Sequence, residues 1–256
     1  MDELFPYQDE GAAWLSTRTH ALLADEMGLG KTAQAITAAD RIQARNIVVV
    51  CPAVARRNWL SEFEKFSTLS RPAAAIMSSR DRPQPDGVTV VSYDLVGCVT
   101  KLSPELLILD ESHFLKNVRA KRTKQLYGTT GLGRRSNRIW CLSGTPAPNN
   151  VAELWTMLQA FGAYKHGYWD FVKDYCDGFD DGFAYKITGT KNVAALRALL
   201  APIMLRRKKA DVLTQLPPIR YSEVVVEPTE LSPYDKEWLF PDYLIKVGGM
   251  RGIDHD

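Results

Sequence analysis

The sequence has little charge imbalance, few cysteines and no long apolar run, and each absence excludes a class of protein. Its 256 residues carry 32 Lys and Arg against 30 Asp and Glu, so bulk charge does not indicate a nucleic-acid partner. The four cysteines form no CxxC pair, which argues against zinc and predicts reduced thiols of an intracellular protein. No stretch approaches about 18 consecutive apolar residues. The acidic start lacks the apolar core of a secretory signal, so we expect neither a membrane partner nor secretion. The location could be cytoplasm, nucleoid or nucleus, or a host cell if the source is viral.

Short apolar runs recur along the first two thirds of the chain. Each has four to six residues bounded by polar or turn residues, at 20–24, 46–51, 88–92, 106–110 and 138–143. Such runs are typical of strands buried on both faces. Stretches of helical period separate them, one beginning at Lys31 and one after Pro148. Asn150 and Glu153 form a capping-box pattern at the start of the second. The sequence therefore predicts an α/β fold with a mostly parallel sheet covered on both faces.

The pattern changes near residue 165, where strand-like runs disappear and the apolar residues take helical spacing. Residues 192–213 read as two short helices broken near Pro202. A late strand is predicted at 222–228. We expect a first domain at 1–164, a helical subdomain at 165–218 packed on it, and a connector at 219–256.

Residues 22–32, LLADEMGLGKT, place an apolar run before a glycine-rich turn and a Lys-Thr pair. A phosphate-binding loop needs a buried strand, then a turn whose backbone N–H groups hold phosphate, then a helix that begins with Lys and Thr. The strict pattern is not met, because Asp25 stands where its first glycine belongs. An ordinary glycine turn before a helix with a solvated lysine is the alternative from this stretch alone.

A second site supports the phosphate-binding reading. Asp110 and Glu111 end a predicted buried strand, where ligands bind in open α/β sheets. A nucleoside triphosphatase needs one carboxylate for Mg²⁺ and one group that orients or deprotonates the attacking water. Adjacent Asp and Glu point in different directions and can divide these roles. The alternative is a helix start that uses acidic residues to match its dipole.

Three stretches in this order carry a family resemblance: DEMGLGKT, LDESHFLKN and LSGTPAPNNVAELW. They resemble motifs I, II and III of superfamily-two helicases and, more narrowly, of Swi/Snf-type DNA translocases. In that family the glycine missing at Asp25 is commonly absent. The stretch from YCDGF to LTQLPP resembles the helical region that follows motif III in the annealing-helicase branch. The resemblance implies a RecA-like P-loop lobe that uses ATP and Mg²⁺.

The resemblance also implies roles for single residues. Lys31 would bind the β- and γ-phosphates, Thr32 and Asp110 would hold Mg²⁺, and Glu111 would be the catalytic base. The loop residues Met27, Gly28, Leu29 and Gly30 would surround the phosphates, and Gln8 in the stretch LFPYQ would read adenine. His113 would connect the nucleotide site to Ser143 and Thr145, which would couple the ATP state to DNA.

Basic clusters are the candidates for DNA contact. The stretch CPAVARRNW resembles motif Ia, which touches a DNA strand, and points to Arg56, Arg57 and Asn58. The run 116–124, which includes Lys116 and Arg119, has five basic residues and no acid. Residues 134–138 and 206–209 add two clusters. Basic groups supply salt-dependent phosphate affinity without reading bases, so we expect sequence-independent duplex binding. For each cluster, a solvated surface is the alternative.

Family motors have two RecA-like lobes, and the second supplies arginine fingers. Its motif, built on glutamine and GR..R, is absent here, and GLGRRSNR at 131–138 lies in the wrong place for it. We therefore expect the first lobe of a longer ATP-driven duplex-DNA translocase that remodels or reanneals DNA, with weak ATPase activity alone. A second lobe would be its partner. A nucleic-acid-binding or protein-interaction module without turnover is the main alternative, and a small-molecule kinase fits the third motif and the helical region badly.

Overall fold

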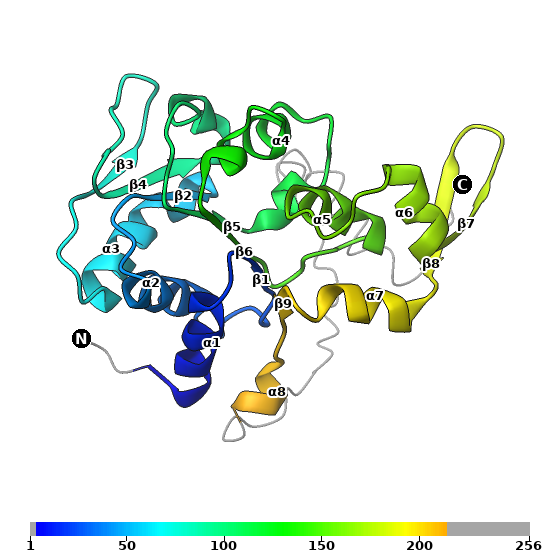
Figure 1. Cartoon of the computed structure of the whole chain (residues 1–256), viewed down its shortest axis with the longest axis horizontal. Coiled ribbons are helices and arrows are strands. Elements are labelled where there is room, and N and C mark those ends of the chain that lie inside the picture. The colour runs from blue at the N-terminus through cyan, green and yellow to red at the C-terminus, as the bar shows by residue number, and fades with distance from the viewer. Residues whose placement is uncertain (1–3, 214–256) are drawn as a thin grey trace, which may run out of the picture. The chain divides into compact units, whose positions relative to one another are not determined.

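A seven-stranded parallel sheet is the centre of the fold. The structure is a computed structural model that describes residues 4–213 (Figure 1). The strand order is β3-β4-β2-β5-β6-β1-β9, and every pairing is parallel. All five predicted apolar runs are strands of this sheet: β1 His20–Leu23, β2 Ile47–Cys51, β4 Val88–Ser92, β5 Leu106–Asp110 and β6 Arg138–Leu142. The predicted α/β fold class is confirmed.

Helices cover both faces of the sheet. Neighbouring residues of a strand point to opposite sides, so each strand has one set of side chains under each helix layer. Leu23 packs into one buried cluster and Leu22 into the other. The first cluster lies under α1 Pro6–Ser16, α2 Lys31–Arg41 and α3 Arg56–Phe66. The second lies under α4 Lys121–Tyr127, α5 Trp155–Ala160 and the 3₁₀ helices η2 Tyr93–Cys98 and η4 Leu132–Arg135. Because helices cover both sides, nearly every residue of the central strands is buried, which explains their continuous apolar runs. Further 3₁₀ turns lie at η1 Ala53–Ala55, η3 Ser112–Leu115 and η5 Val151–Leu154.

The start of the helix after Pro148 is partly as predicted. The Asn150 side chain caps η5 by accepting a hydrogen bond from the Ala152 N–H at 3.1 Å. The reciprocal bond of the capping box is different, because Glu153 accepts from the N–H of Asn149 at 3.2 Å and also binds its side chain. The capping residue is confirmed, and the expected return bond to Asn150 is wrong.

Both edge strands of the sheet were missed by the sequence analysis. β3 Ala73–Ile76 pairs with β4, and its alanines are partly exposed. β9 Met204–Leu205 pairs with β1 and has two residues. The two short helices predicted for the stretch 192–213 form as α7 Val193–Leu200 and α8 Lys209–Val212, which has four residues; the strand β9 between them was not predicted.

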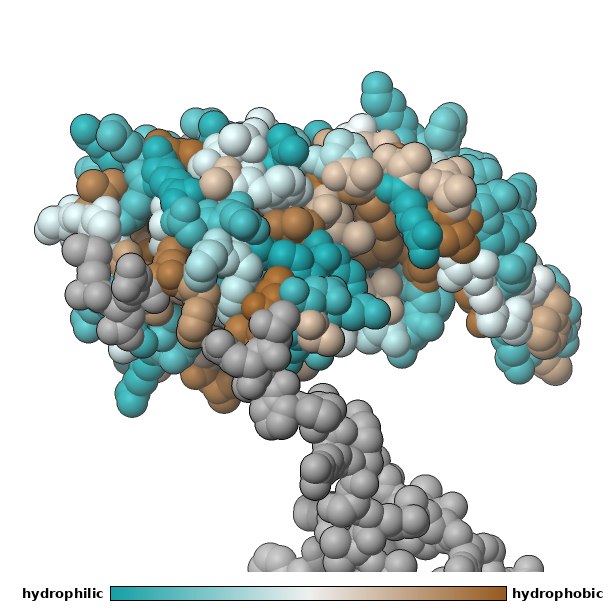
Figure 2. Space-filling view, turned by 90° about the horizontal axis from the view of Figure 1, so that it is seen from below, coloured by the Kyte–Doolittle hydropathy of each residue, from teal (hydrophilic) through white to brown (hydrophobic). Residues whose placement is uncertain are grey.

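The expectation that strands disappear after residue 165 is also wrong. Between α6 Tyr168–Tyr175 and α7 lies an antiparallel hairpin of β7 Cys176–Asp180 and β8 Tyr185–Thr190. Most of its residues are exposed, so no buried apolar face marked it in the sequence. Figure 1 shows the hairpin extending away from the sheet, and in Figure 2 it is the projection at the right, with polar and apolar residues side by side.

Other predictions fall outside the described residues. These are the strand at 222–228, the connector at 219–256 and the end of the subdomain at 165–218. Within residues 4–213, no helix has the length and apolar character that crossing a membrane requires.

Candidate nucleotide site

The predicted motifs meet at one edge of the sheet. β1, β5 and β6 are parallel neighbours, so the residues that follow them share the edge at the strands' carboxyl ends. Gly144, after β6, lies so close to the loop after β1 that a Cβ on it would be 2.6 Å from Met27 Cγ and 3.6 Å from Lys31 Nζ. Segments more than 110 residues apart in the sequence are thus brought together.

The loop of residues 25–30 has the form that phosphate binding requires. Gly28 and Gly30 have φ values of +84° and +69°, which favour glycine over any residue with a side chain. Lys31 and Thr32 begin α2, so their N–H groups lie at the positive end of a helix. Leu29 is buried, and Met27 is 61% exposed.

The Lys31 ammonium is held inside this loop. It donates hydrogen bonds to the main-chain oxygens of Asp25 at 2.9 Å and Glu26 at 3.3 Å. Burial lowers the pKa of Lys31, while the nearby carboxylates of Glu111, Asp25 and Asp110 act in the opposite direction. A partly buried cation among backbone oxygens is suited to receive phosphate, which would replace those weaker partners.

Gln8 lies against the same loop. Its Oε1 accepts from the Phe5 N–H at 3.0 Å, and its Nε2 donates to the Leu29 carbonyl at 3.3 Å. A Cβ on Gly30 would come within 2.2 Å of that Nε2, so the glycine leaves room for the glutamine. The structure thus places Gln8 at the loop, and its reading of adenine stays a prediction.

Asp110 is positioned by a residue that the sequence analysis gave no role. The indole N–H of Trp59, in α3, donates to Asp110 Oδ2 at 2.9 Å, and the Glu111 N–H donates to Oδ1 at 3.0 Å. The Tyr93 hydroxyl donates to the Asp110 carbonyl at 2.7 Å. Burial raises the pKa of Asp110, and the Trp59 bond opposes that shift. The CPAVARRNW stretch contains Trp59, but its ring could not be paired with Asp110 without the fold.

Glu111 and His113 connect the site to the segment after β6. Glu111 has a left-handed backbone, with φ +49°, and its Oε2 lies 3.3 Å from His113 Nδ1. The same Nδ1 lies 3.1 Å from Ser143 Oγ, which accepts from the Thr145 N–H at 3.2 Å. The contacts required for the predicted coupling are therefore present. Coupling itself stays a prediction.

The oxygen donors at this edge suit Mg²⁺. Among residues 4–213, no group of three or more His, Cys, Asp and Glu could hold a metal alone. Thr32 and Asp110 supply one hydroxyl and one carboxylate, and Mg²⁺ is usually bound by one or two carboxylates with phosphates and waters. The donor set fits a Mg²⁺ ion that arrives with a nucleotide.

The basic run 206–209 is partly bound to the loop that follows β1. Arg207 forms an ion pair with Asp25, which is fully buried. Arg206 donates to the carbonyls of Ala24 at 3.1 Å and Gly144 at 3.3 Å. The Lys209 side chain lies over the nucleotide loop, where a Cβ on Gly28 would be 3.3 Å from its Nζ. Arg207 is thus committed to an internal carboxylate, whereas Arg206 and Lys208 are exposed, and DNA contact by this run stays a prediction.

The residues predicted to contact DNA differ in exposure and in whether their side chains are already bonded within the protein. Arg57 and Asn58 are exposed at the start of α3. Arg56 donates to the carbonyls of Ala53 and Ile76, so it also holds β3 in place. Lys116 forms an ion pair with Glu153 at 2.8 Å. Arg119 is exposed, and its N–H is capped by the Asn117 side chain.

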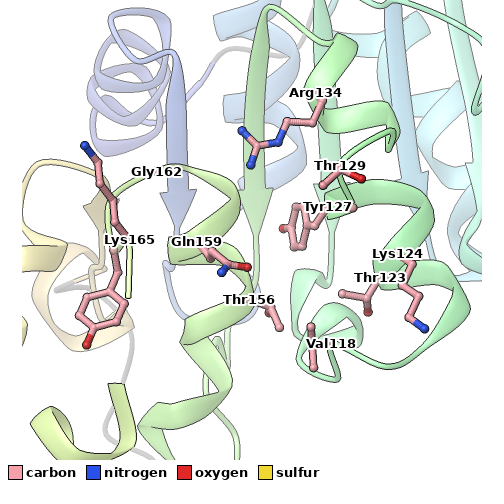
Figure 3. Close-up of a pocket in the computed structure, with 12 residues that line it drawn as sticks. Val118, Thr123, Lys124, Tyr127, Thr129, Arg134, Thr156, Gln159, Gly162 and Lys165 are labelled. Atoms are coloured by element: carbon pink, nitrogen blue, oxygen red, sulfur yellow. The ribbon is translucent and has the colours of Figure 1, made fainter. Parts of the chain in front are cut away.

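Two hollows flank α4 and share Lys124. One has a volume of about 440 Å³, and Figure 3 shows Arg134, Tyr127 and Gln159 directed toward its space. The other, of about 590 Å³, is lined by Arg119 and further basic residues. No Asp or Glu lines either one, and within the described part of the chain none of their cations is in an ion pair. We call these seven cations the α4 basic surface: Lys101, Arg119, Lys121, Lys124, Arg134, Arg135 and Lys165.

A parallel sheet with a glycine-rich loop after β1 and an Asp-Glu pair at the carboxyl end of β5 is typical of the P-loop class of nucleotide-binding domains. This chain belongs to the SNF2 family: residues 7–238 match the SNF2-related domain. It is a SNF2-family ATPase domain, and membership of this family implies the use of ATP.

Curated relatives include DNA annealing helicases. The chain is 36% identical over 242 residues to the SWI/SNF-related matrix-associated actin-dependent regulator of chromatin subfamily A-like protein 1 of Xenopus tropicalis, covering 91% of this chain and 25% of that protein. It is 32% identical over 235 residues to the DNA annealing helicase and endonuclease ZRANB3 of Mus musculus, covering 84% of this chain and 22% of that protein. The chain thus spans about a quarter of the length of these relatives.

A solved structure gives the same lobe. The Sulfolobus solfataricus SWI2/SNF2 ATPase core in complex with double-stranded DNA has a TM-score of 0.69 and 25% identity. The match covers 84% of this chain and 47% of that one. The seven-stranded sheet described above therefore matches one lobe of a SWI2/SNF2 ATPase core.

Proposed function

We propose that this chain is the ATP-binding first lobe of a DNA-dependent ATPase that translocates on duplex DNA and remodels or reanneals it. The observation that carries the proposal is the meeting of three segments at one sheet edge. Lys31 lies in the loop after β1, Glu111 follows β5, and Ser143 follows β6, linked to Glu111 through His113. A phosphate-binding lysine and a carboxylate that can orient the attacking water are two of the groups that phosphoryl transfer to water requires.

Each group has a defined task in this proposal. The N–H groups at the start of α2 and the Lys31 ammonium bind the β- and γ-phosphates. Glu111 accepts a proton from the attacking water, and His113 holds the Glu111 carboxylate through their 3.3 Å contact. Bound Mg²⁺, held through Thr32 and Asp110, would neutralise phosphate charge. Trp59 keeps the Asp110 carboxylate turned toward the site through its 2.9 Å hydrogen bond.

The DNA contact is proposed to be electrostatic. Arg57 and Asn58 on α3, together with the α4 basic surface, offer groups for phosphates and no arrangement for base edges. The DNA-bound relative supports a duplex as the partner. Binding is therefore expected to be independent of sequence and to weaken as salt rises.

Turnover by this chain alone is expected to be slow. In phosphoryl transfer an arginine finger contributes about 10³–10⁵ in rate. The proposal assigns that group to a second lobe, because this chain matches less than half of the two-lobed ATPase core. A second RecA-like lobe is therefore the proposed partner of the surface that carries Lys31 and Glu111.

The test measures ATP affinity and hydrolysis by the chain, with and without duplex DNA. Lys31→Ala should abolish binding, and Glu111→Gln should keep binding while it removes the residual hydrolysis. Lys173→Ala and Glu64→Gln, both at exposed positions, are the matched controls and should behave as the wild type. Absence of ATP binding would reject the nucleotide site. ATP binding with no hydrolysis in any condition, even with a second lobe supplied, would favour a binding module without turnover.

A further inference from the structure

Asp25 stands where the strict phosphate-loop pattern has glycine, and its carboxylate is fully buried. A buried carboxylate is costly unless it is paired and hydrogen-bonded. Asp25 accepts four hydrogen bonds. Three come from Arg207, from its main-chain N at 3.0 Å, its Nε at 3.1 Å and its Nη2 at 2.5 Å. The fourth comes from Gln34 Nε2 at 3.1 Å.

Arg207 joins three elements of the nucleotide site through one guanidinium. Besides Asp25 it donates to the Gln34 side chain of α2 at 2.7 Å and to the Tyr7 carbonyl of α1. Its guanidinium carbon also lies 5.5 Å from the centre of the Tyr7 ring. The same two helices carry Gln8 and Lys31. Arg207 therefore fixes the parts that surround a nucleotide relative to one another.

The main chain around Arg207 continues this attachment. The Ala24 N–H donates to the Leu205 carbonyl at 2.7 Å, and the Glu26 N–H donates to the Arg207 carbonyl at 3.0 Å. Gln34, which binds Asp25, also donates to the Leu29 carbonyl at 3.0 Å. The loop is thus held at its start by residues 205–207 and near its end by Gln34.

Gly11 shows that α1 makes room for this network. A Cβ on Gly11 would lie 1.9 Å from Gln34 Oε1 and 2.6 Å from Arg207 Nη2. Glycine lowers helix stability in the middle of a helix, where alanine is the better residue. Its presence within α1 is therefore explained by the close approach of the Arg207 and Gln34 side chains.

We propose that Arg207 is a positioning residue for the nucleotide loop. It holds the loop in its binding shape through Asp25, so nucleotide affinity depends on the docking of segment 203–209 beside β1. Arg207 itself does not contact the phosphates. The inference rests on the proposed nucleotide site and adds a determinant that lies 182 positions along the chain from Asp25.

A second buried ion pair provides a matched control. Arg71 and Asp40 have side-chain exposures of 6% and 8%, beside 14% and 0% for Arg207 and Asp25. Arg71 binds the Ala44 carbonyl and the Ser67 hydroxyl and has no contact with the loop of residues 25–30. Replacing either arginine by lysine keeps the charge and loses the planar fork, which lysine cannot reproduce.

The experiment measures the dissociation constant of Mg·ADP by calorimetry for the whole 256-residue chain. Thermal melts first establish a temperature at which each variant is folded. Arg207→Lys and Arg71→Lys should both lower the melting temperature. Only Arg207→Lys should weaken ADP binding, by about tenfold or more, because small misplacements at a binding site are costly. Equal affinities in the two folded variants would overturn the inference.

Gly11→Ala gives an independent test that removes no charge, and it decides the matter if Arg207→Lys does not fold. The new methyl group should displace Arg207 and Gln34 and weaken ADP binding, although alanine favours the helix. Unchanged ADP affinity in folded Gly11→Ala would count against the positioning role. A wild-type chain that does not bind ADP, or a Lys31→Ala variant that binds as well as wild type, would reject the proposed nucleotide site instead.

Discussion

The run Arg206–Lys209 and the α4 basic surface differ in what faces them. Arg207 faces a buried carboxylate and two helices, and all of its donor nitrogens are bonded within the protein. Lys121 and Arg119 face solvent beside a hollow that has no acidic residue. Both regions carry several positive charges within a few residues. In the first region Arg207 is paired inside the protein, whereas no cation of the α4 basic surface is in an ion pair within residues 4–213.

We therefore expect the internal partner of a cation, more than the local density of cations, to determine its role. Asp25 is the residue that separates the two cases, because it turns Arg207 into an internal group. Phosphate binding by a basic surface can be predicted only once it is known which of its cations are already paired with carboxylates of the same protein. Three predictions test this distinction, ordered from the largest expected effect to the smallest.

Removing Arg207 should have the largest effect. Arg207→Ala leaves the Asp25 carboxylate buried without its partner, which should lower the free energy of unfolding by about 3–5 kcal/mol. Arg206→Ala loses hydrogen bonds to two carbonyls and should cost about 1 kcal/mol. Urea denaturation at neutral pH measures both. Similar losses in the two variants would break the contrast between the internal ion pair and its neighbour.

Removing two cations of the α4 basic surface should affect DNA binding and leave stability nearly unchanged. Each phosphate contact contributes about 0.9 to the slope of log K against log salt. Arg119→Gln combined with Lys121→Gln should therefore reduce that slope by about 2. Fluorescence anisotropy with a labelled duplex at several salt concentrations measures the slope.

The matched control for that variant is Arg45→Gln with Lys173→Gln, one arginine and one lysine at exposed positions elsewhere. It should leave the slope unchanged. If both double variants lower the slope equally, the α4 basic surface has no special role in DNA binding. Two duplexes of unrelated sequence should give the same result.

Lys116 forms a partly exposed ion pair with Glu153, and its removal should give the smallest effect. Burial opposes the shift, but hydrogen bonds from Lys116 and Asn149 outweigh it and lower the pKa of Glu153. A carboxyl whose pKa is lowered by folding stabilises the protein above its unfolded pKa. That stabilisation is lost as pH falls through the folded pKa.

Lys116→Met should therefore be less stable than wild type near pH 7, by up to about 1 kcal/mol, since the pair is partly exposed. The difference should shrink as pH falls below the unfolded pKa of Glu153 and close once Glu153 is protonated in the folded protein. Urea denaturation across the acid range measures it. A difference that stays constant with pH would show that Glu153 is not the group that Lys116 stabilises.

The strands that could be predicted are those with both faces buried. Val48 and Val49, for example, pack into opposite clusters, so the whole of β2 is apolar and is recognisable as a run. β3 is alanine-rich and partly exposed, and β9 has two residues inside a stretch of helical spacing. The hairpin of β7 and β8 is mostly exposed and has no buried face to set a period of two. These elements depend on tertiary position more than on local pattern.

The residues of the candidate site also fall into those that a local pattern predicts and those that only the fold reveals. Lys31, Asp110 and Glu111 were predictable because each lies within a local spacing that its chemistry requires. Trp59 and Arg207 were not, because each meets its carboxylate across a long sequence separation. The only local sign of Arg207 was an aspartate in place of a glycine. That aspartate departs from the strict phosphate-loop pattern, and in the structure its carboxylate binds Arg207 and Gln34.

The separation of Asp25 and Arg207 also has a consequence for the newly made chain. A ribosome adds about 5–20 residues per second, so roughly 10 to 40 s pass between the synthesis of the two residues. During that interval Arg207 is not yet available to pair with the Asp25 carboxylate, although β1 and α2 have already been made. The ATP loop is then among the last parts of the lobe to be completed. A nascent chain would form most of its sheet before Arg207 could fix the shape of the nucleotide loop.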